Sequence, residues 1–514
     1  MIVMKNEIDK LICKMINVCD SWIRTENNST YFIDPIENKE ILGHYGASHV
    51  AAAFIIYGEE NGNKQIFEKG NKLLNSLLNR WDLIKSQPDF HNDFNNFALC
   101  LIERYLDRTG HVSNIKRIEE IVLNTLDSSH DTVNWLPMRA YVNYCRYLWT
   151  DDMKYRSTYE ECLCNIKKAT FEDGFIEDRL PKGLSFNLQY DVATVAVMQF
   201  IKNLDMDIDI SNEFTALMNV VSPDHDINYL GRGTNQIFAW GLWIYLLSSS
   251  GDKECLNAVH YLGDRLDSML NKNNLMLNEW DGHDRYLWWD YHYCSVYTAH
   301  LLLWLVLAKK DNNKFQVEKN NKYKFLDSGL NVIGNQNLSL VWFNGRKEYL
   351  AEKGPVITNL WLERLGCVCK GTFGPWRGAF GNKYSNDDVI HNYFGLIKVN
   401  YNKEISNNRV LRRLGIHINE IDFIKYTPYF LSFDSEVEDK KIFIKWLNQS
   451  EEELYLNIPV FVKKREFVNH VKLYVDKVIV PLEGYSMIKN QYDWCLLLKS
   501  KICNGKEWIL EITD

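Results

Sequence analysis

The chain divides into two parts that differ in the period of their apolar positions. From the N-terminus to about residue 310, apolar residues recur at helical spacing, first over 8–22, 66–81, 97–106 and 115–126. The same period continues over 133–149, 155–169, 190–204, 235–249, 253–270 and 291–309. Long helices separated by loops, without strand-like alternation, predict helix pairs packed as a bundle or as a closed ring.

Beyond residue 310 the pattern changes. Residues 311–322 are polar and charged, which is typical of a linker or an exposed loop. From 323 to 514, short alternating or apolar runs such as 338–342 and 454–460 are separated by turn signals such as Asn344-Gly345. We therefore expect an N-terminal helical domain over 1–310 and a C-terminal antiparallel β-sandwich over 323–514.

Clusters of polar and aromatic residues recur just before or at the predicted helix starts. They lie at 44–49, 91–96, 134–135, 189–190, 232–235 and 279–284. Asn and Asp at these places are also good helix N-caps, so each cluster by itself has a structural explanation. In a closed ring, however, such helix ends would converge on one face. We expect that face to line a sugar-binding cleft.

Composition restricts the class of ligand. The chain of 514 residues contains 16 Trp and 28 Tyr, which favour places where a flat apolar face meets water, including carbohydrate clefts, large cores and protein interfaces. A formal net charge of -8 argues against binding to nucleic acid through phosphate neutralisation. It leaves an anionic sugar open, because a few local Arg and Lys residues can reverse the field inside a cleft.

No cofactor or metal is expected. The turn 231–233 lacks the Lys-Ser/Thr of a phosphate-binding loop. His283 lies near Asp281 and Asp284, but no other motif with ligand spacing accompanies them. The 12 cysteines form no zinc-type pair of motifs and fit a reducing compartment.

The N-terminal residues 1–7 lack a signal-peptide pattern, and the longest candidate apolar run, 299–308, is too short to cross a bilayer. The expectation is a soluble, cytoplasmic protein without a membrane partner, and the oligomeric state stays open.

Four short motifs occur in a distinctive order: Asn134-Trp135, Asp173-Gly174-Phe175, Gln189-Tyr190 and Gly231-Arg232-Gly233. This order resembles the toroid-plus-sandwich polysaccharide lyases of the hyaluronate, chondroitin and heparinase-like groups. Those lyases carry an Asn-Trp element, an Asp-Gly-Ser-Phe turn, a helix with the catalytic Tyr, and a Gly-Arg-Ser element. The resemblance implies an (α/α) toroid that cleaves an acidic poly- or oligosaccharide by β-elimination.

The resemblance also implies roles for individual residues. Tyr190 would act as base and then acid, while Asn134 and Arg232 would neutralise the uronate carboxylate that makes the neighbouring C5 proton a poor acid. A His that follows the turn in the lyases is absent here, so His91 is the first candidate for that role, ahead of His44 and His283. The expected substrate-binding residues are Asn96, Trp135, Gln189, Asn235, Trp280, Asp281, His283 and Trp289.

Structural roles remain open for the same residues. Tyr190 could simply end a core helix with its hydroxyl at the surface. Arg232 could form an ion pair with Asp224 or Asp226. His91 could belong to a capping turn.

Two other functions also remain open. A glycoside hydrolase needs two carboxylates, which Glu177 or Asp178 together with Glu279 or Asp281 could supply. A catalytically silent saccharide-binding protein is the third hypothesis. It would bind sugar without turnover and would be insensitive to Tyr190→Phe.

Overall fold

We describe a computed structural model of the chain. It covers residues 2–85, 91–110, 112–129, 132–183, 186–204, 208–228, 230, 237–250, 252–273, 294–310, 322–324, 327–344, 347–348, 351–352, 355–370, 394–404, 421–428, 434–447, 454–489, 494–502 and 507–514. The chain forms two compact units, the first comprising Met1–Val221, His225–Ile227 and Gly233–Lys319, the second Ser222–Asp224, Asn228–Arg232 and Asn320–Asp514.

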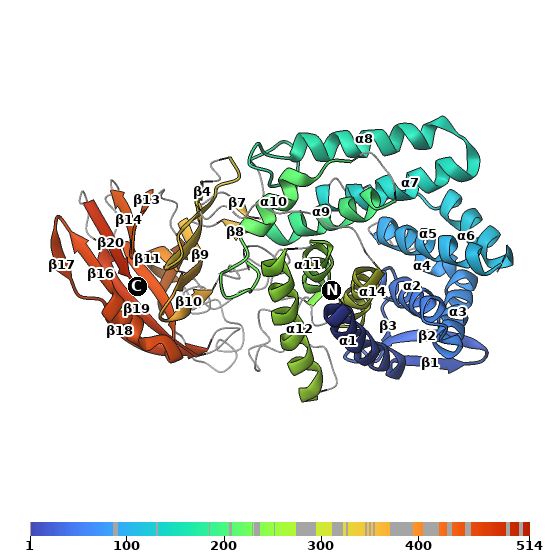
Figure 1. Cartoon of the computed structure of the whole chain (residues 1–514), viewed down its shortest axis with the longest axis horizontal. Helices are drawn as coiled ribbons and strands as arrows, with labels where there is room; N and C mark the ends of the chain where they lie inside the picture. Colours follow the sequence, from blue (N-terminus) through green and yellow to red (C-terminus); the bar gives the residue numbers. More distant parts are fainter. Residues whose placement is uncertain are drawn as a thin grey trace. The chain divides into compact units, whose positions relative to one another are not determined.

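The first unit contains a closed ring of six inner helices (Figure 1). These are α2 (Gly46–Glu60), α5 (Asn92–Thr109), α7 (Leu136–Thr150), α9 (Leu188–Lys202), α11 (Ile237–Ser249) and α14 (Cys294–Lys310). Each packs against the next in this order, and α14 packs back against α2. The inner helices are therefore buried on nearly all sides, as their largely apolar sequences require.

An outer helix covers each inner helix. The outer helices are α1 (Ile2–Ser21), α3 (Lys64–Asn79), α6 (Val112–Asn124), α8 (Met153–Ala169), α10 (Ser211–Asn219) and α12 (Lys253–Asn273), which pack on α14, α2, α5, α7, α9 and α11 respectively. They are amphipathic: in α3, Leu73, Leu74, Leu77 and Leu78 are buried. Two short elements, α4 (Trp81–Lys85) and the 3-10 turn η2 (Val133–Trp135), complete the described helices.

Aromatic side chains fill the middle of the ring. Phe97 of α5 lies with its ring centroid 5.4 Å from Tyr141, 5.7 Å from Phe200 and 6.3 Å from Trp304. Tyr245 of α11 packs edge-on against Trp304 at 5.0 Å. This layer joins five of the six inner helices, and we call these five residues the aromatic layer. These contacts make the interior of the ring at this level a packed apolar core.

Three short strands in the first unit correct the prediction that residues 1–310 are helical throughout. β1 (Ile23–Glu26), β2 (Ser29–Asp34) and β3 (Lys39–Glu40) form an antiparallel meander. Residues of β2 alternate between buried and partly exposed positions. Asp34, fully buried, accepts hydrogen bonds from the backbone N–H of Ile36 at 2.9 Å and of Ser295 at 2.7 Å. The meander therefore ties the start of α14 to the beginning of the chain.

The second unit is antiparallel β. A ten-stranded sheet contains β4 (Lys322–Lys324), β5 (Leu330–Gly334), β6 (Leu338–Asn344), β9 (Pro355–Leu362), β10 (Gly366–Lys370), β11 (Gly395–Glu404), β12 (Ile421–Pro428), β15 (Leu454–Phe461), β18 (Glu483–Lys489) and β19 (Trp494–Ile502). A five-stranded sheet contains β13 (Asp434–Glu438), β14 (Lys441–Leu447), β16 (Val471–Val475), β17 (Val478–Val480) and β20 (Glu507–Thr513). A two-stranded pair, β7 (Lys347–Glu348) with β8 (Ala351–Glu352), and the turn η4 (Val462–His470) complete it.

Both large sheets contribute to one hydrophobic core. Leu340 and Leu456 of the larger sheet belong to the same buried cluster as Ile444 and Leu510 of the smaller one. The indole Nε1 of Trp342 donates a hydrogen bond to the Ser435 hydroxyl at 2.9 Å, linking β6 to β13. The expected change from helices to antiparallel sheets is thus present, while the sandwich arrangement stays a prediction.

Candidate functional site

The N-terminal ends of neighbouring inner helices lie together. The start of α14 touches the start of α2, because a Cβ built on Gly46 would lie 3.2 Å from Cα of Val296. Tyr45, just before α2, stacks on Phe94 in the first turn of α5, with ring centroids 4.4 Å apart. Trp135, just before α7, lies 5.5 Å from Phe94, and its turn η2 contacts α9. We call these converging ends of α14, α2, α5, α7 and α9 the N-terminal rim.

The six polar and aromatic clusters found in the sequence all precede inner helices. Clusters 44–49, 91–96, 134–135 and 189–190 lead into α2, α5, α7 and α9 and lie at the rim. Clusters 232–235 and 279–284 precede α11 and α14 in the chain. The predicted site residues Arg232, Asn235, Trp280, Asp281, His283 and Trp289, with Glu279, lie outside the described residues.

Histidine and aromatic side chains pack into one group at the rim. We call it the rim cluster, and it comprises His44, Tyr45, His49, His91, Phe94, Trp135 and His300. His44 and His91 are the closest pair, with ring centroids 4.0 Å apart, and Trp135 lies 6.0 Å from His91. His300 of α14 lies 5.2 Å from His49 of α2. The cluster therefore brings together two of the three histidines expected to replace the lyase His.

A backbone contact fixes the tautomer of His91. Its Nδ1 lies 2.9 Å from the carbonyl oxygen of Gly43, an arrangement that requires a proton on Nδ1. In the neutral ring the lone pair then resides on Nε2, where it can accept a proton. Asn95 supports the same turn, because its Nδ2 donates to the His91 carbonyl at 3.3 Å and its Oδ1 accepts from the Ser48 hydroxyl at 2.7 Å.

Burial keeps His44, His49 and His300 of the rim cluster neutral. Desolvation lowers the pKa of His44 to about 4 and that of His300 to about 3. The pKa of His49 also lies well below the ordinary value, first because of burial and second because of His300. At neutral pH these imidazoles act as uncharged donors and acceptors rather than as cations.

Several buried polar atoms at the rim have no hydrogen-bond partner within the described part of the chain. Asn96 is 0% exposed and neither its Oδ1 nor its Nδ2 is bonded, while Asn134 is 7% exposed with an unbonded Oδ1. Nε2 of His49 is also unbonded. Leaving such a group unsatisfied costs about 1–3 kcal/mol, so stability does not explain them.

The start of α9 combines a structural residue with a partly exposed one. Asn187 caps the helix by accepting from the Gln189 backbone N–H at 3.1 Å. Oε1 of Gln189 accepts from the indole Nε1 of Trp243 at 3.1 Å, which ties α9 to α11. This bond gives Gln189, predicted to bind substrate, a structural role. Tyr190 is partly exposed at the same helix end, where it remains the predicted base.

In the turn that resembles the lyase Asp-Gly-Ser-Phe element, the backbone conformation and close packing require glycine at position 174. Gly174 has φ of +90°, and a Cβ there would lie 2.7 Å from the backbone oxygen of Asn212 in α10. The backbone N–H of Phe175 donates to Asp173 Oδ1 at 3.3 Å. The motif thus shapes a tight turn beneath α10.

The two described carboxylates of the hydrolase hypothesis differ in their surroundings. Oε2 of Glu177 accepts from the Gly183 backbone N–H at 2.6 Å and so holds the following loop. Asp178 is buried beside the rim, because its carbonyl oxygen accepts from the Val133 backbone N–H of η2 at 2.9 Å. Asp178 is therefore the better placed of the two.

Four members of the rim cluster were not predicted as site residues: Tyr45, His49, Phe94 and His300. His300 offered one signal, a histidine within the otherwise apolar run 299–308. Its position opposite His49 follows only from the contact between α14 and α2.

Comparisons with known proteins give likeness of fold only. No protein-family model and no curated protein matches the chain. Among solved structures, the GH76A α-1,6-mannanase from Salegentibacter sp. HEL1_6 matches with TM-score 0.42 and 11% identity over 59% of this chain and 99% of that one. A polysaccharide lyase gives 0.39 and 10% over 59% and 97%. An unsaturated glucuronyl hydrolase from Streptococcus agalactiae gives 0.39 and 13% over 60% and 91%.

These matched proteins are carbohydrate enzymes of both the hydrolase and the lyase class, and likeness at this level assigns no activity. No described helix has the length and apolar character needed to cross a bilayer. The described residues also contain no group of three or more His, Cys, Asp or Glu side chains placed to hold a metal ion.

Proposed function

We propose that this chain is a carbohydrate-active enzyme that binds a uronate-containing oligosaccharide at the N-terminal rim and cleaves it by β-elimination. The rim cluster is the observation that carries the proposal. Tyr45, Phe94 and Trp135 are aromatic residues of the kind that line carbohydrate sites, and they pack against one another there with less than a tenth of each residue exposed. His91, with its lone pair on Nε2, lies among them at 4.0 Å from His44. Aromatic rings and a proton acceptor thus occur in one place.

The rim also suits a carboxylate. The N-terminus of a helix carries roughly half a positive charge and unsatisfied N–H groups, so several such ends in one place favour an anion. Nδ2 of Asn96 is a buried donor without a partner in the described part of the chain. With Asn134 and the predicted Arg232, such donors would neutralise the uronate group and stabilise the enolate-like transition state.

The reaction then follows from the substrate. A base removes the proton at C5, the C–H electron pair forms the C4=C5 double bond, and the C4–O bond breaks. The departing oxygen receives a proton. We assign Tyr190 as the group that takes the C5 proton and returns it to the leaving oxygen, with His91 in place of the missing lyase His. Support for this pairing comes from η2, which contacts α9 and carries Trp135 against His91.

The test is the formation of an unsaturated product. The protein is incubated with a panel of acidic oligosaccharides while ultraviolet absorbance of the C4=C5 bond is recorded. Tyr190→Phe should lower kcat by about 10²–10⁴, the usual contribution of general acid–base catalysis. Tyr144→Phe is the matched control, because Tyr144 packs on Tyr159 of the outer helix α8 and should not affect turnover. Full activity of Tyr190→Phe would reject the assigned mechanism.

A hydrolase remains the second candidate because Asp178 is a buried carboxylate adjoining η2. It would act as one carboxylate of a pair whose other member, Glu279 or Asp281, lies outside the described residues. In that case the panel would yield new reducing ends without ultraviolet absorbance. Asp178→Asn, rather than Tyr190→Phe, would then abolish turnover.

A further inference from the structure

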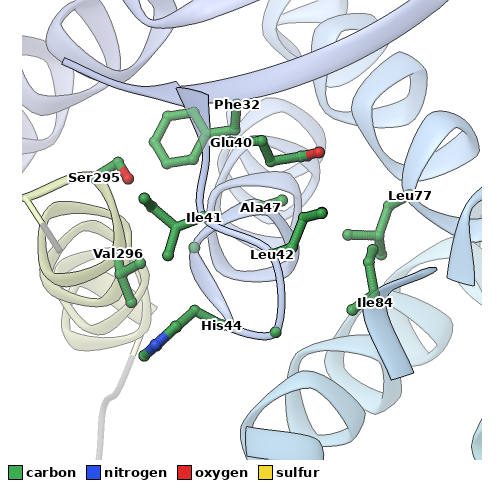
Figure 2. A pocket seen from close by; sticks show the side chains of 12 residues that line it. Phe32, Glu40, Ile41, Leu42, His44, Ala47, Leu77, Ile84, Ser295 and Val296 are labelled. Carbon is green, nitrogen blue, oxygen red and sulfur yellow. The ribbon is translucent and has the colours of Figure 1, made fainter. Parts of the chain in front are cut away.

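A pocket lies next to the rim cluster, on the side of α2 that faces α14 and α3 (Figure 2). About 310 Å³ of space lies between its lining residues, a volume that includes open solvent, so the pocket is a shallow depression rather than an enclosed cavity. The pocket is lined by Phe32, Glu40, Ile41, Leu42, Gly43, His44, Gly46, Ala47, Leu77, Ile84, Ser295 and Val296. Three of its lining residues, His44, Gly46 and Ala47, belong to cluster 44–49, and none of its lining residues is assigned a step in the proposed reaction.

The lining suits a small uncharged group. Most side chains are apolar, and Figure 2 shows Ile41 on the side of Val296 and Leu42 on the side of Leu77. The carboxylate of Glu40 is already engaged, because Nη2 of Arg80 lies 3.1 Å from its Oε1. The remaining polar side chains are His44, which burial keeps neutral, and Ser295. An anion or cation would lose hydration here without gaining a partner.

The pocket is continuous with the rim cluster. His44 lines the pocket and also packs against His91 at 4.0 Å. Gly43, another lining residue, holds His91 through its carbonyl oxygen at 2.9 Å. A saccharide at the rim would therefore place any substituent on its His44 side at the pocket mouth. Leu42, 42% exposed, is the apolar surface such a substituent would cover.

We propose that this pocket is a subsite for an O-acetyl substituent of the saccharide bound at the rim. This inference rests on the proposed function and adds a substrate class, the O-acetylated acidic oligosaccharides. The acetyl methyl group matches the apolar lining of Ile41, Leu42 and Val296. The acetyl carbonyl is an acceptor for the Ser295 hydroxyl, and the group carries no charge. Burial of its methyl surface should increase affinity about five- to tenfold.

Two synthetic glucuronate trisaccharides that differ by one O-acetyl group provide the test. Binding is measured by calorimetry and cleavage by ultraviolet absorbance. The wild-type protein should bind the acetylated trisaccharide about five- to tenfold more tightly. Ala47→Leu fills the pocket, and Leu42→Ala removes part of its wall, so each should reduce this ratio towards one. Two variants with opposite changes in volume protect the test against misfolding of either.

Leu148→Ala is the control, because Leu148 is a leucine of α7 that is 61% exposed and outside the pocket. It should leave the wild-type ratio unchanged. Equal binding of the two trisaccharides by wild type, or an unchanged ratio in both pocket variants, would overturn the subsite while cleavage still supported the proposed function. Absence of both binding and cleavage of either trisaccharide would instead reject the proposed function, and the subsite with it.

Discussion

The rim cluster and the aromatic layer are formed by the same inner helices, but they differ in the side chains that pack together. In α5, Phe94 belongs to the rim cluster and Phe97 to the aromatic layer, three residues further along. Around Phe97 the neighbours are the aromatic rings of Tyr141, Phe200 and Trp304. Around Phe94 they include Tyr45, Trp135 and histidines. Less than one helical turn separates an apolar core from a polar site.

The two regions also differ in how many buried polar groups lack a hydrogen-bond partner. The aromatic layer gains stability from buried apolar area and close packing, which hold five inner helices together. At the rim, buried amides of Asn96 and Asn134 have unbonded atoms in the described part of the chain, and the histidines are held neutral. Such features lower stability. Among the described residues, the aromatic layer has one such atom, Nε1 of Trp304, whereas Asn96, Asn134 and His49 at the rim have four between them.

The largest expected effect is on the aromatic layer. Phe97→Ala should lower the free energy of unfolding by about 3–5 kcal/mol, since it removes a fully buried ring from a closed layer. Phe94→Ala should cost less, because the space it leaves adjoins the rim and can fill with water, yet it should weaken oligosaccharide binding more. Urea unfolding and calorimetry of both variants measure this. If one of the two variants caused the larger loss of both stability and binding, the distinction between the two regions would be contradicted.

The second effect concerns pH. His300 has a pKa lowered from 6.5 to about 3 in the folded protein. Below pH 6.5 the unfolded chain binds a proton that the folded chain does not, so this contribution to stability is present above pH 6.5 and is lost as pH falls towards 3. His300→Gln removes it. The stability difference between wild type and variant should shrink by on the order of 2–3 kcal/mol from pH 7 to pH 4.5.

Other groups that titrate in this range are common to both proteins and cancel in the difference, except His49, whose pKa His300 lowers. His225→Gln, at a partly exposed position beside Glu254, is the control and should change the curve less. The free energy of unfolding is measured by urea unfolding at each pH. If it changed with pH in the same way for wild type and His300→Gln, the rim would not hold this imidazole neutral.

The smallest expected effect is an increase in the free energy of unfolding. Asn96→Leu replaces an unsatisfied buried amide with an apolar side chain of similar size and should stabilise the protein by about 1 kcal/mol. It should also weaken binding of the acidic oligosaccharide at least tenfold. Asn143→Leu is the matched change at a satisfied amide, which donates to Asp127 at 2.9 Å and accepts from Arg146 at 3.2 Å, and should destabilise by about 1–3 kcal/mol. Destabilisation by Asn96→Leu would mean that its amide has a structural partner.

Helices of both layers followed from the sequence, because every inner helix except α2 and every outer helix except α10 overlaps a predicted helical stretch. The stripe predicted over 66–81 corresponds to α3, and that over 253–270 to α12, because one face of each is apolar and the other polar. For α2 the sequence indicated only a helix start at cluster 44–49 and no apolar stripe, since 46–60 is buried on nearly all sides. The strand β2 was missed because only six residues carry its alternation.

For the candidate site, the sequence supplied the residue types and their place before the helices. His91, Asn134 and Tyr190 occur at the starts of α5, α7 and α9, as their clusters predicted. Their catalytic and binding roles stay predictions. Tyr45 and His300 were missed because their importance depends on neighbours that no local pattern identifies.

Local spacing of apolar residues, turn residues and capping residues determined that this chain begins with helices, continues as antiparallel strands and places polar clusters at helix starts. Only the tertiary structure decided that α14 returns to α2, which brings His300 next to Tyr45, a residue 255 positions earlier in the chain. It also decided that His44, His49 and His300 are neutral. The reason is physical: periodicity records which face of a segment is buried, whereas ring closure and desolvation depend on which other segments bury it.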